Sequence, residues 1–256
     1  MRFFLLVFLQ GLSFFSYSGV IPENSRIVFD GDNKLQSSVL VNTNKYPVVV
    51  QLWVDNGDFT KTPEKASAPF FVTPVTSKMD PLKLNEIKII FSGELKDIPQ
   101  DRESLYWLNI FEIPPVNNNK KEDNEVTLSM LTQIKLIYRP ARLRVNADEL
   151  RQELQLVTYK LEKGDSGLNI TLDNPTPYVA NLASLAIFGR KGNEIASLKS
   201  GQSMDLSLLP MSSKKISTSI KSDISNINGV EIFLVNDKGG VYSQKQTLPP
   251  NALGSF

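Results

Sequence analysis

The side chains that most often carry enzymatic chemistry are missing from this sequence. Its 256 residues include no histidine and no cysteine, which excludes a serine–histidine–aspartate triad, a cysteine–histidine pair and a thiolate zinc site. Catalysis by paired carboxylates or by lysine remains as an alternative. The pairs Asp55 with Asp58 and Glu122 with Asp123 are interpreted as solvated loop charges. We therefore expect a protein that is not an enzyme and that uses no cofactor or metal.

A second group of residues is suited to packing rather than to chemistry. Val126, Leu128 and Met130 alternate with polar residues, and alternate side chains of a strand point to the same face. Taken alone, the pattern favours a row that faces the core of its own domain. A strand that adds to the sheet of another protein would show the same pattern, and each such side chain contributes roughly 1.5–3 kcal/mol when fully buried.

The elements that position these residues are short strands. Apolar residues recur with a period of two, and Gly, Asn, Asp and Pro residues separate the runs, as in an all-β sandwich or barrel. Seven strands are predicted before residue 139, at 26–29, 38–42, 48–54, 70–74, 87–91, 105–113 and 126–138.

The sequence Arg139-Pro140-Ala141-Arg142 ends this pattern, because proline cannot donate a hydrogen bond to a sheet. A short helix is predicted next, capped by Asn146 with Glu149 and carrying Leu150 and Leu154 on one face. Further strands are predicted at 154–159, 168–172, 179–188, 206–209, 215–220, 231–235 and 241–243.

The first residues read as a secretory signal peptide. Met1-Arg2 precedes the apolar run 3–9, and Ser16-Tyr17-Ser18 offers small residues for cleavage after about Ser18 or Gly19. A short membrane anchor is the less favoured alternative, since the run is short and lacks charged flanks. We expect three parts: a signal peptide at 1–18, an N-terminal domain at 19–141 and a C-terminal domain at 142–256.

The charge of the chain argues against two kinds of partner. The formal net charge is +1, from 28 basic and 27 acidic residues, so no strong field would attract nucleic acid or an anionic membrane. No second apolar run of membrane-spanning length follows the first. We expect no nucleic acid partner and no membrane insertion after signal removal.

Four segments, taken in order, resemble the PapD-like periplasmic chaperones of chaperone–usher pili, over essentially the whole mature chain. They are Arg26-Ile27-Val28-Phe29-Asp30-Gly31, the region from Pro99 to Pro115, Thr132 to Pro140, and Asn174-Pro175-Thr176-Pro177-Tyr178. The resemblance implies two immunoglobulin-like β-sandwich domains in a boomerang arrangement with a cleft between them. It also implies that a strand of the chaperone completes pilus subunits, which then pass to an outer-membrane usher.

The resemblance assigns roles to five residues of the first domain. Arg26 and Lys135 would anchor the C-terminal carboxylate of the subunit, and Val126, Leu128 and Met130 would form the donor strand. Lys135 is an odd number of residues from Met130, so an unbroken strand would turn the two to opposite faces. Either a bulge intervenes, or the cation and the apolar row serve different surfaces.

The resemblance also matches Glu103, Arg139 and Asp237 to an ion-pair network between the domains; the alternative is three ordinary surface charges. The loop before residue 126 and the lack of cysteine suit the subgroup with a short loop. We expect a periplasmic chaperone of pilus or fimbrial subunits that is able to self-associate when free. The alternative from the class of interaction proteins is a pilus structural subunit or adhesin, and a β-sandwich hydrolase or sugar-binding enzyme is a third.

Overall fold

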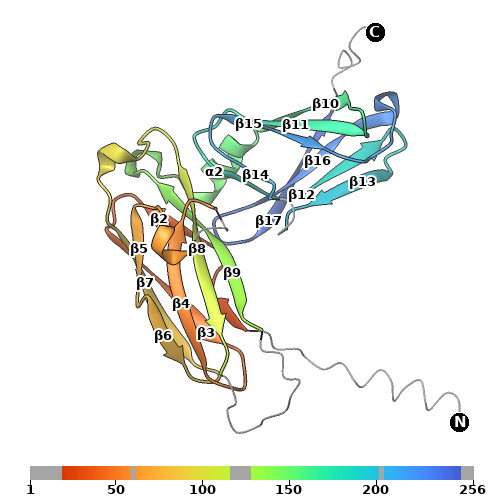
Figure 1. The fold of residues 1–256 in the computed structure, drawn as a ribbon. Helices are drawn as coiled ribbons and strands as arrows, with labels where there is room; N and C mark the ends of the chain where they lie inside the picture. The colour runs from red at the N-terminus through yellow and green to blue at the C-terminus, as the bar shows by residue number, and fades with distance from the viewer. Residues whose placement is uncertain (1–18, 59–61, 116–127, 202–204, 249–256) are drawn as a thin grey trace, which may run out of the picture.

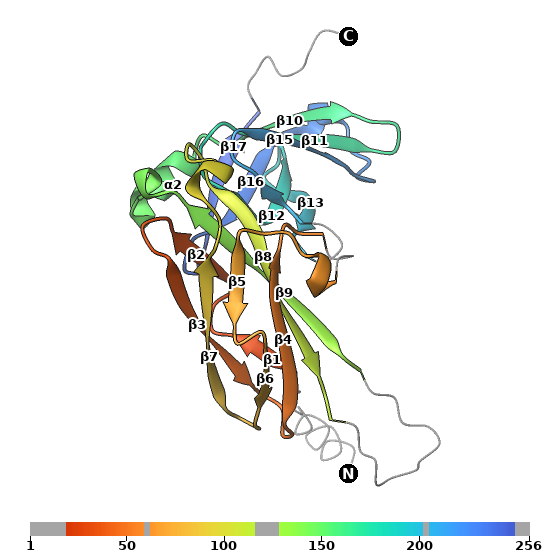
Figure 2. The same cartoon turned by 60° about the vertical axis from the view of Figure 1, so that its left-hand side comes forward.

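The chain folds into two all-β units that meet at an angle (Figure 1). The structure is a computed structural model, and it describes residues 19–58, 62–115, 128–201 and 205–248. The view turned by 60° shows the N-terminal unit below and the C-terminal unit above it, with helix α2 beside their junction (Figure 2). The expected all-β fold with two immunoglobulin-like sandwiches is confirmed.

The N-terminal unit is a sandwich of two sheets. The first has the order β1-β3-β7-β5 and the second the order β2-β9-β8-β4-β6. Their strands are β1 (Val20–Pro22), β2 (Arg26–Asp30), β3 (Leu35–Asn42), β4 (Val48–Asp55), β5 (Phe70–Thr73), β6 (Thr76–Met79), β7 (Leu84–Phe91), β8 (Ser104–Ile113) and β9 (Met130–Arg139). Two short 3-10 helices, η1 (Pro63–Lys65) and η2 (Leu95–Asp97), lie in its loops.

Alternation along the strands places the core of this unit between its sheets. Val50 and Leu52 of β4 are at most 1% exposed, which fits the burial of every second strand residue. Aromatic side chains fill the end near the second unit, where the rings of Phe29 and Phe70 lie 5.1 Å apart and those of Phe70 and Tyr138 6.1 Å apart. The core therefore fixes the face that each residue of β9 presents.

The C-terminal unit has a smaller sheet of order β10-β11-β15 and a larger one of order β13-β12-β16-β17, with β14 paired to β12. Its elements are η3 (Ala141–Leu143), α2 (Ala147–Leu154), β10 (Thr158–Lys163), β11 (Leu168–Asn174), β12 (Ala180–Gly189), β13 (Glu194–Lys199), β14 (Ser207–Leu208), β15 (Ser212–Ser217), η4 (Ile224–Asn226), β16 (Ile227–Val235) and β17 (Val241–Thr247). No helix in the described ranges has the length and apolar character needed to cross a membrane.

The predicted helix is confirmed, and one predicted strand is wrong at its start. Asn146 Oδ1 accepts hydrogen bonds from the backbone amides of Asp148 and Glu149, and Glu149 Oε2 accepts one from the backbone amide of Asn146. This capping box begins α2, which runs to Leu154, so the strand predicted at 154–159 begins only at Thr158.

Other differences concern strand ends, three short strands and one long range. The strand predicted at 215–220 is found at Ser212–Ser217, and that predicted at 241–243 extends to Thr247. Strands β1, β6 and β13 have 3, 4 and 6 residues and were not predicted. In the range 126–138, residues 126 and 127 lie outside the described residues, and the strand begins at Met130. The expected domain boundary between residues 141 and 142 falls in the connection from β9 to α2 and stays a prediction.

Candidate functional site: a cationic cleft between the two units

One face of strand β9 is directed at the core of its own unit, and the other face is directed at the cleft between the units. Its antiparallel register with β8 runs without a shift from Met130, opposite Glu112, to Tyr138, opposite Ser104. Leu136 and Tyr138 therefore point into the core, whereas Lys135 points to the other face. No bulge intervenes between Met130 and Lys135, so the cation and the apolar row lie on different faces.

The cleft face of β9 borders a cavity of about 1030 Å³ between the units. Trp107, Gln133 and Lys135 line it from the N-terminal unit, and Asp205 and Lys214 line it from the C-terminal unit. A cavity of this volume is at the upper end of ordinary ligand sites. It therefore has room for a peptide segment.

Lys135 is held inside the cleft by polar groups of the other unit. Its Nζ donates to Asp205 Oδ1 at 3.1 Å and to Ser207 Oγ, and it lies 5.4 Å from the centre of the Trp107 ring. Only 13% of the Lys135 side chain is exposed. Burial lowers the pKa of Lys135, and the charge of Asp205 acts against this effect. The free protein thus keeps a carboxylate beside this lysine.

Arg26 lies beside Lys135, because β2 pairs in parallel with β9 and places the two residues in register. It is 9% exposed, and neither its Nε nor its Nη1 has a hydrogen-bond partner among the described residues. Burial lowers the pKa of Arg26, and the charge of Asp237 opposes this shift. A buried guanidinium with unsatisfied donors is costly. Arg26 is therefore suited to receive an anion.

Sequence reasoning missed the contribution of the C-terminal unit to this cleft. Lys214 of β15 donates to the backbone carbonyl oxygens of Asp205 and Ser207, and its charge contributes to the lowered pKa of Lys135. Although burial acts to raise it, the pKa of Asp205 is lowered by the charge of Lys135. Asp205 and Lys214 directly precede the strands predicted at 206–209 and 215–220, and no motif in the sequence marks them.

The structure brings Glu103, Arg139 and Asp237 together at the junction of the units. Arg139 Nε donates to Glu103 Oε1 at 2.5 Å, and its Nη1 and Nη2 donate to Asp237 at 2.8 and 3.1 Å. Glu103 is 3% exposed and also accepts the amide of Val179 at 2.7 Å. Burial raises the pKa of Glu103, whereas the charge of Arg139 lowers it. The three side chains link both units through one guanidinium.

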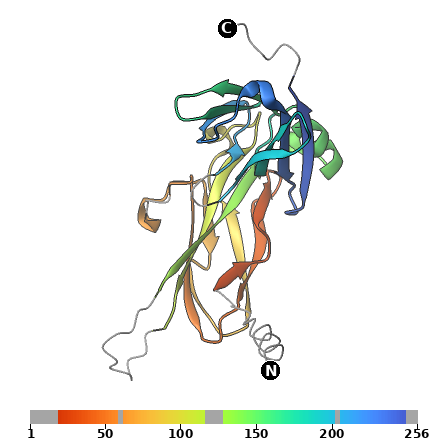
Figure 3. The ribbon, with the colours of Figure 1, turned by 90° about the vertical axis from the view of Figure 1, so that its right-hand side faces the viewer.

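Of the predicted donor row, Val126 lies outside the described residues. The other two members are not buried in the core, since Leu128 is 79% and Met130 39% exposed. Figure 3 shows the paired ends of β8 and β9 projecting from the body of the N-terminal unit. Strand β2 pairs with β9 only from Lys135 to Arg139. The other edge of residues 130–134 therefore has no strand neighbour in the described part of the chain.

These features define a two-domain protein of immunoglobulin-like sandwiches, with a cationic cleft between the domains and an open strand edge beside it. Two family models match the chain: "Pili and flagellar-assembly chaperone, PapD N-terminal domain" over residues 19–144 and "Pili assembly chaperone PapD, C-terminal domain" over residues 152–246. The chain belongs to the family of PapD-like pilus assembly chaperones.

Individual relatives agree with this assignment. The chain is 30% identical to the probable fimbrial chaperone YadV of Escherichia coli K12 over 228 residues, which cover 88% of each chain. It is 29% identical to the chaperone protein FimB/FhaD of Bordetella pertussis over 226 residues, 88% of this chain and 86% of the relative. The crystal structure of the CupB2 chaperone of Pseudomonas aeruginosa matches with a TM-score of 0.67 and 25% identity, covering 89% of this chain and all of that one.

Proposed function

We propose that the protein is a periplasmic chaperone that binds pilus or fimbrial subunits in the cleft and delivers them to an outer-membrane usher. The single observation that carries the binding site is Arg26, a buried guanidinium beside Lys135 with two nitrogens that have no partner in the described part of the chain. A carboxylate held by both cations gains charge-assisted hydrogen bonds, about twice as strong as neutral ones. The C-terminal carboxylate of a subunit is a group of this kind at the end of a strand.

The open edge of β9 supports a donor-strand mechanism. Residues 130–134 have no strand neighbour on the side away from β8 among the described residues, so they can accept a strand from another protein. Met130 at the start of this segment and Leu128 just before it are exposed. In the complex they would enter the core of the subunit, and Val126 would extend the row. The anchor at Lys135 then sets the register in which the partner strand pairs.

The alternative of a pilus structural subunit is less well supported. Such a subunit carries its own N-terminal donor extension, whereas residues from Val20 to Pro22 form β1 and pair with β3 of the same unit. The family of the chain is a chaperone family, which favours binding over catalysis. Export through removal of residues 1–18, and the usher as second partner, belong to the proposal and rest on the family.

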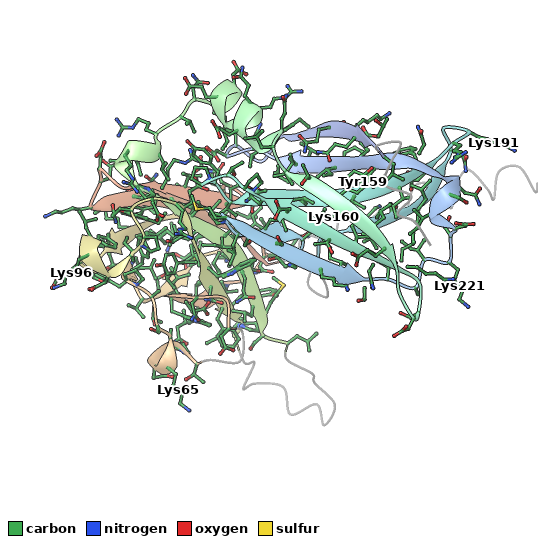
Figure 4. All side chains as sticks on the ribbon, turned by 90° about the horizontal axis from the view of Figure 1, so that it is seen from above. Lys65, Lys96, Tyr159, Lys160, Lys191 and Lys221 are labelled. Carbon is green, nitrogen blue, oxygen red and sulfur yellow. The ribbon has the colours of Figure 1, made fainter. Side chains whose placement is uncertain are left out.

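The test is periplasmic co-expression with the subunit encoded beside the chaperone, followed by affinity capture. We expect a one-to-one complex with the wild type and its loss with Arg26→Ala or Lys135→Ala, because truncating one partner of a buried charge pair costs about 2–5 kcal/mol, or about 30-fold or more in affinity. The matched control is Lys191→Ala, an exposed lysine at the far end of the C-terminal unit (Figure 4).

Circular dichroism of each variant separates lost binding from lost folding. Capture that survives in folded Arg26→Ala and Lys135→Ala variants would place the anchor elsewhere and refute this site. A wild type that captures no neighbouring subunit would refute the chaperone function and favour the structural subunit.

A further inference from the structure

Glu112, near the end of β8, is a buried carboxylate that forms no ion pair within the described ranges. It is 5% exposed, its Oε2 accepts the amide of Val20 at 2.7 Å, and its Oε1 accepts Asn44 Nδ2 at 2.7 Å. Among the described residues, no lysine or arginine forms an ion pair with it. Buried charges are normally paired, because an isolated ionised carboxylate is costly to remove from water.

Gly19 lies directly against this carboxylate. A Cβ atom on Gly19 would stand 2.8 Å from Glu112 Oε2 and would collide with the methyl group of Met130. The φ of Gly19 is +87°, a conformation that glycine adopts at little cost. Its carbonyl oxygen accepts the amide and the hydroxyl of Thr43 at 3.1 and 2.6 Å. Position 19 is thus fixed in place, and only glycine fits there without a shift of its neighbours.

We propose that removal of residues 1–18 supplies the missing cation, so that the new α-ammonium group of Gly19 binds Glu112. Hydrolysis of the Ser18–Gly19 peptide bond by a signal peptidase adds one water molecule. It leaves a carboxylate on Ser18 and an amine on Gly19, which takes up a proton at neutral pH. The nitrogen that becomes charged is bonded to the Gly19 Cα, the same atom from which an added Cβ would reach to 2.8 Å from Glu112 Oε2.

This ion pair would join the two sheets of the N-terminal unit. Residue 19 leads into β1 of one sheet, whereas Glu112 belongs to β8 of the other. Met130, the first residue of β9, is paired with Glu112 and touches the Gly19 site. The groups that face Glu112 are therefore the Val20 amide of β1, Asn44 from the β3–β4 connection and Met130 of β9, and none of them titrates. Processing thus strengthens the sandwich at the end of the open edge that lies farthest from Lys135.

The test compares chains of defined start, released from a cleavable fusion, that begin at Gly19 or at Ser18. One extra residue displaces the charge from Glu112 but keeps every side chain. We expect the melting temperature of the Ser18 form to be lower by about 3–8 °C near pH 6.5. When both chains carry Glu112→Gln, the form that begins at Gly19 and the form that begins at Ser18 should have the same melting temperature. N-terminal sequencing of the exported protein should begin at Gly19.

The pH dependence gives a second readout. An ion pair raises the pKa of the α-amino group above its ordinary value of about 8. The stabilisation is then full below pH 8 and is lost as the pH rises through the raised value. Acetylation of the Gly19 amine in the unsubstituted chain should reproduce the loss at pH 6.5, which keeps the test open if Glu112→Gln does not fold. The proposal would be overturned by equal melting temperatures for the chains that begin at Gly19 and at Ser18. It would also be overturned if the Ser18 form lost as much melting temperature with Glu112→Gln as without it, or if the exported protein had another N-terminus.

Discussion

Arg139 and Arg144 offer a direct test of how burial sets the strength of an ion pair in this fold. Each arginine bridges two acidic side chains: Arg139 binds Glu103 and Asp237, and Arg144 binds Asp30 and Asp32. The Arg139 side chain is 9% exposed and that of Arg144 62%. Loss of one partner from a buried pair costs about 3–5 kcal/mol, whereas exposed pairs contribute about 0–1 kcal/mol.

The expected result is that Arg139→Ala destabilises the protein by about 3–5 kcal/mol, and Arg144→Ala by less than about 1 kcal/mol. Urea unfolding measures both values, with circular dichroism for the whole chain. Trp53 and Trp107 are the only tryptophans. Both lie in the N-terminal unit and Trp107 also lines the cleft, so their fluorescence reports that unit and its contact with the other. Separate transitions in the Arg139→Ala variant, against a single one in the wild type, would show that the guanidinium couples the units.

The stability that Arg139→Ala removes depends on pH because of Glu103. Burial already raises its pKa, and Arg139 is the main cause acting against this shift. Without Arg139 the pKa of Glu103 rises further, so the carboxyl group is protonated on folding as the pH falls. The loss in Arg139→Ala should therefore be largest near pH 7–8 and smaller near pH 5. Equal costs for the two arginine variants at pH 7 would refute the argument from burial.

Three further changes test other parts of the molecule. Asp205→Asn removes the carboxylate that binds Lys135 in the free protein. When the variant and the wild type compete for one subunit, the variant should therefore bind several-fold more of it; more subunit on the wild type would contradict this. Leu128→Glu should leave urea stability within about 0.5 kcal/mol but reduce subunit capture, and unchanged capture would remove Leu128 from the donor row. Asn146→Ala deletes the helix cap and should cost about 1 kcal/mol in urea unfolding, with Asp148→Ala, which leaves the cap in place, as the control.

The longer strands β3, β4 and β7 of the N-terminal unit could be predicted because buried residues alternate along them, whereas the short strands β1 and β6 have too few residues to show a pattern. The start of the strand predicted at 154–159 was wrong, since helix α2 runs to Leu154 and the strand begins only at Thr158. The pairing of Lys135 with Asp205 could not be predicted, because a loop aspartate of the other domain carries no periodic signal. The buried state of Glu112 depends on a chain segment some 90 residues away, which local sequence does not reveal.

Strand β2 stops pairing with β9 at Lys135, and this position affects which C-terminal lengths of a partner chain the cleft can accept. The open edge begins next to Lys135, and successive strand residues advance about 3.3 Å. If the last residue of a partner strand is held at that cation, the distance of each partner residue from its own C-terminus sets which residue of β9 it pairs with, from Lys135 towards the projecting tip. Lengthening the partner by one residue would turn every side chain to the opposite face. Such a site would discriminate between subunits with the native C-terminus and subunits whose C-terminus is longer or shorter. A subunit with one added C-terminal residue should therefore fail to bind, although its core-facing sequence is intact.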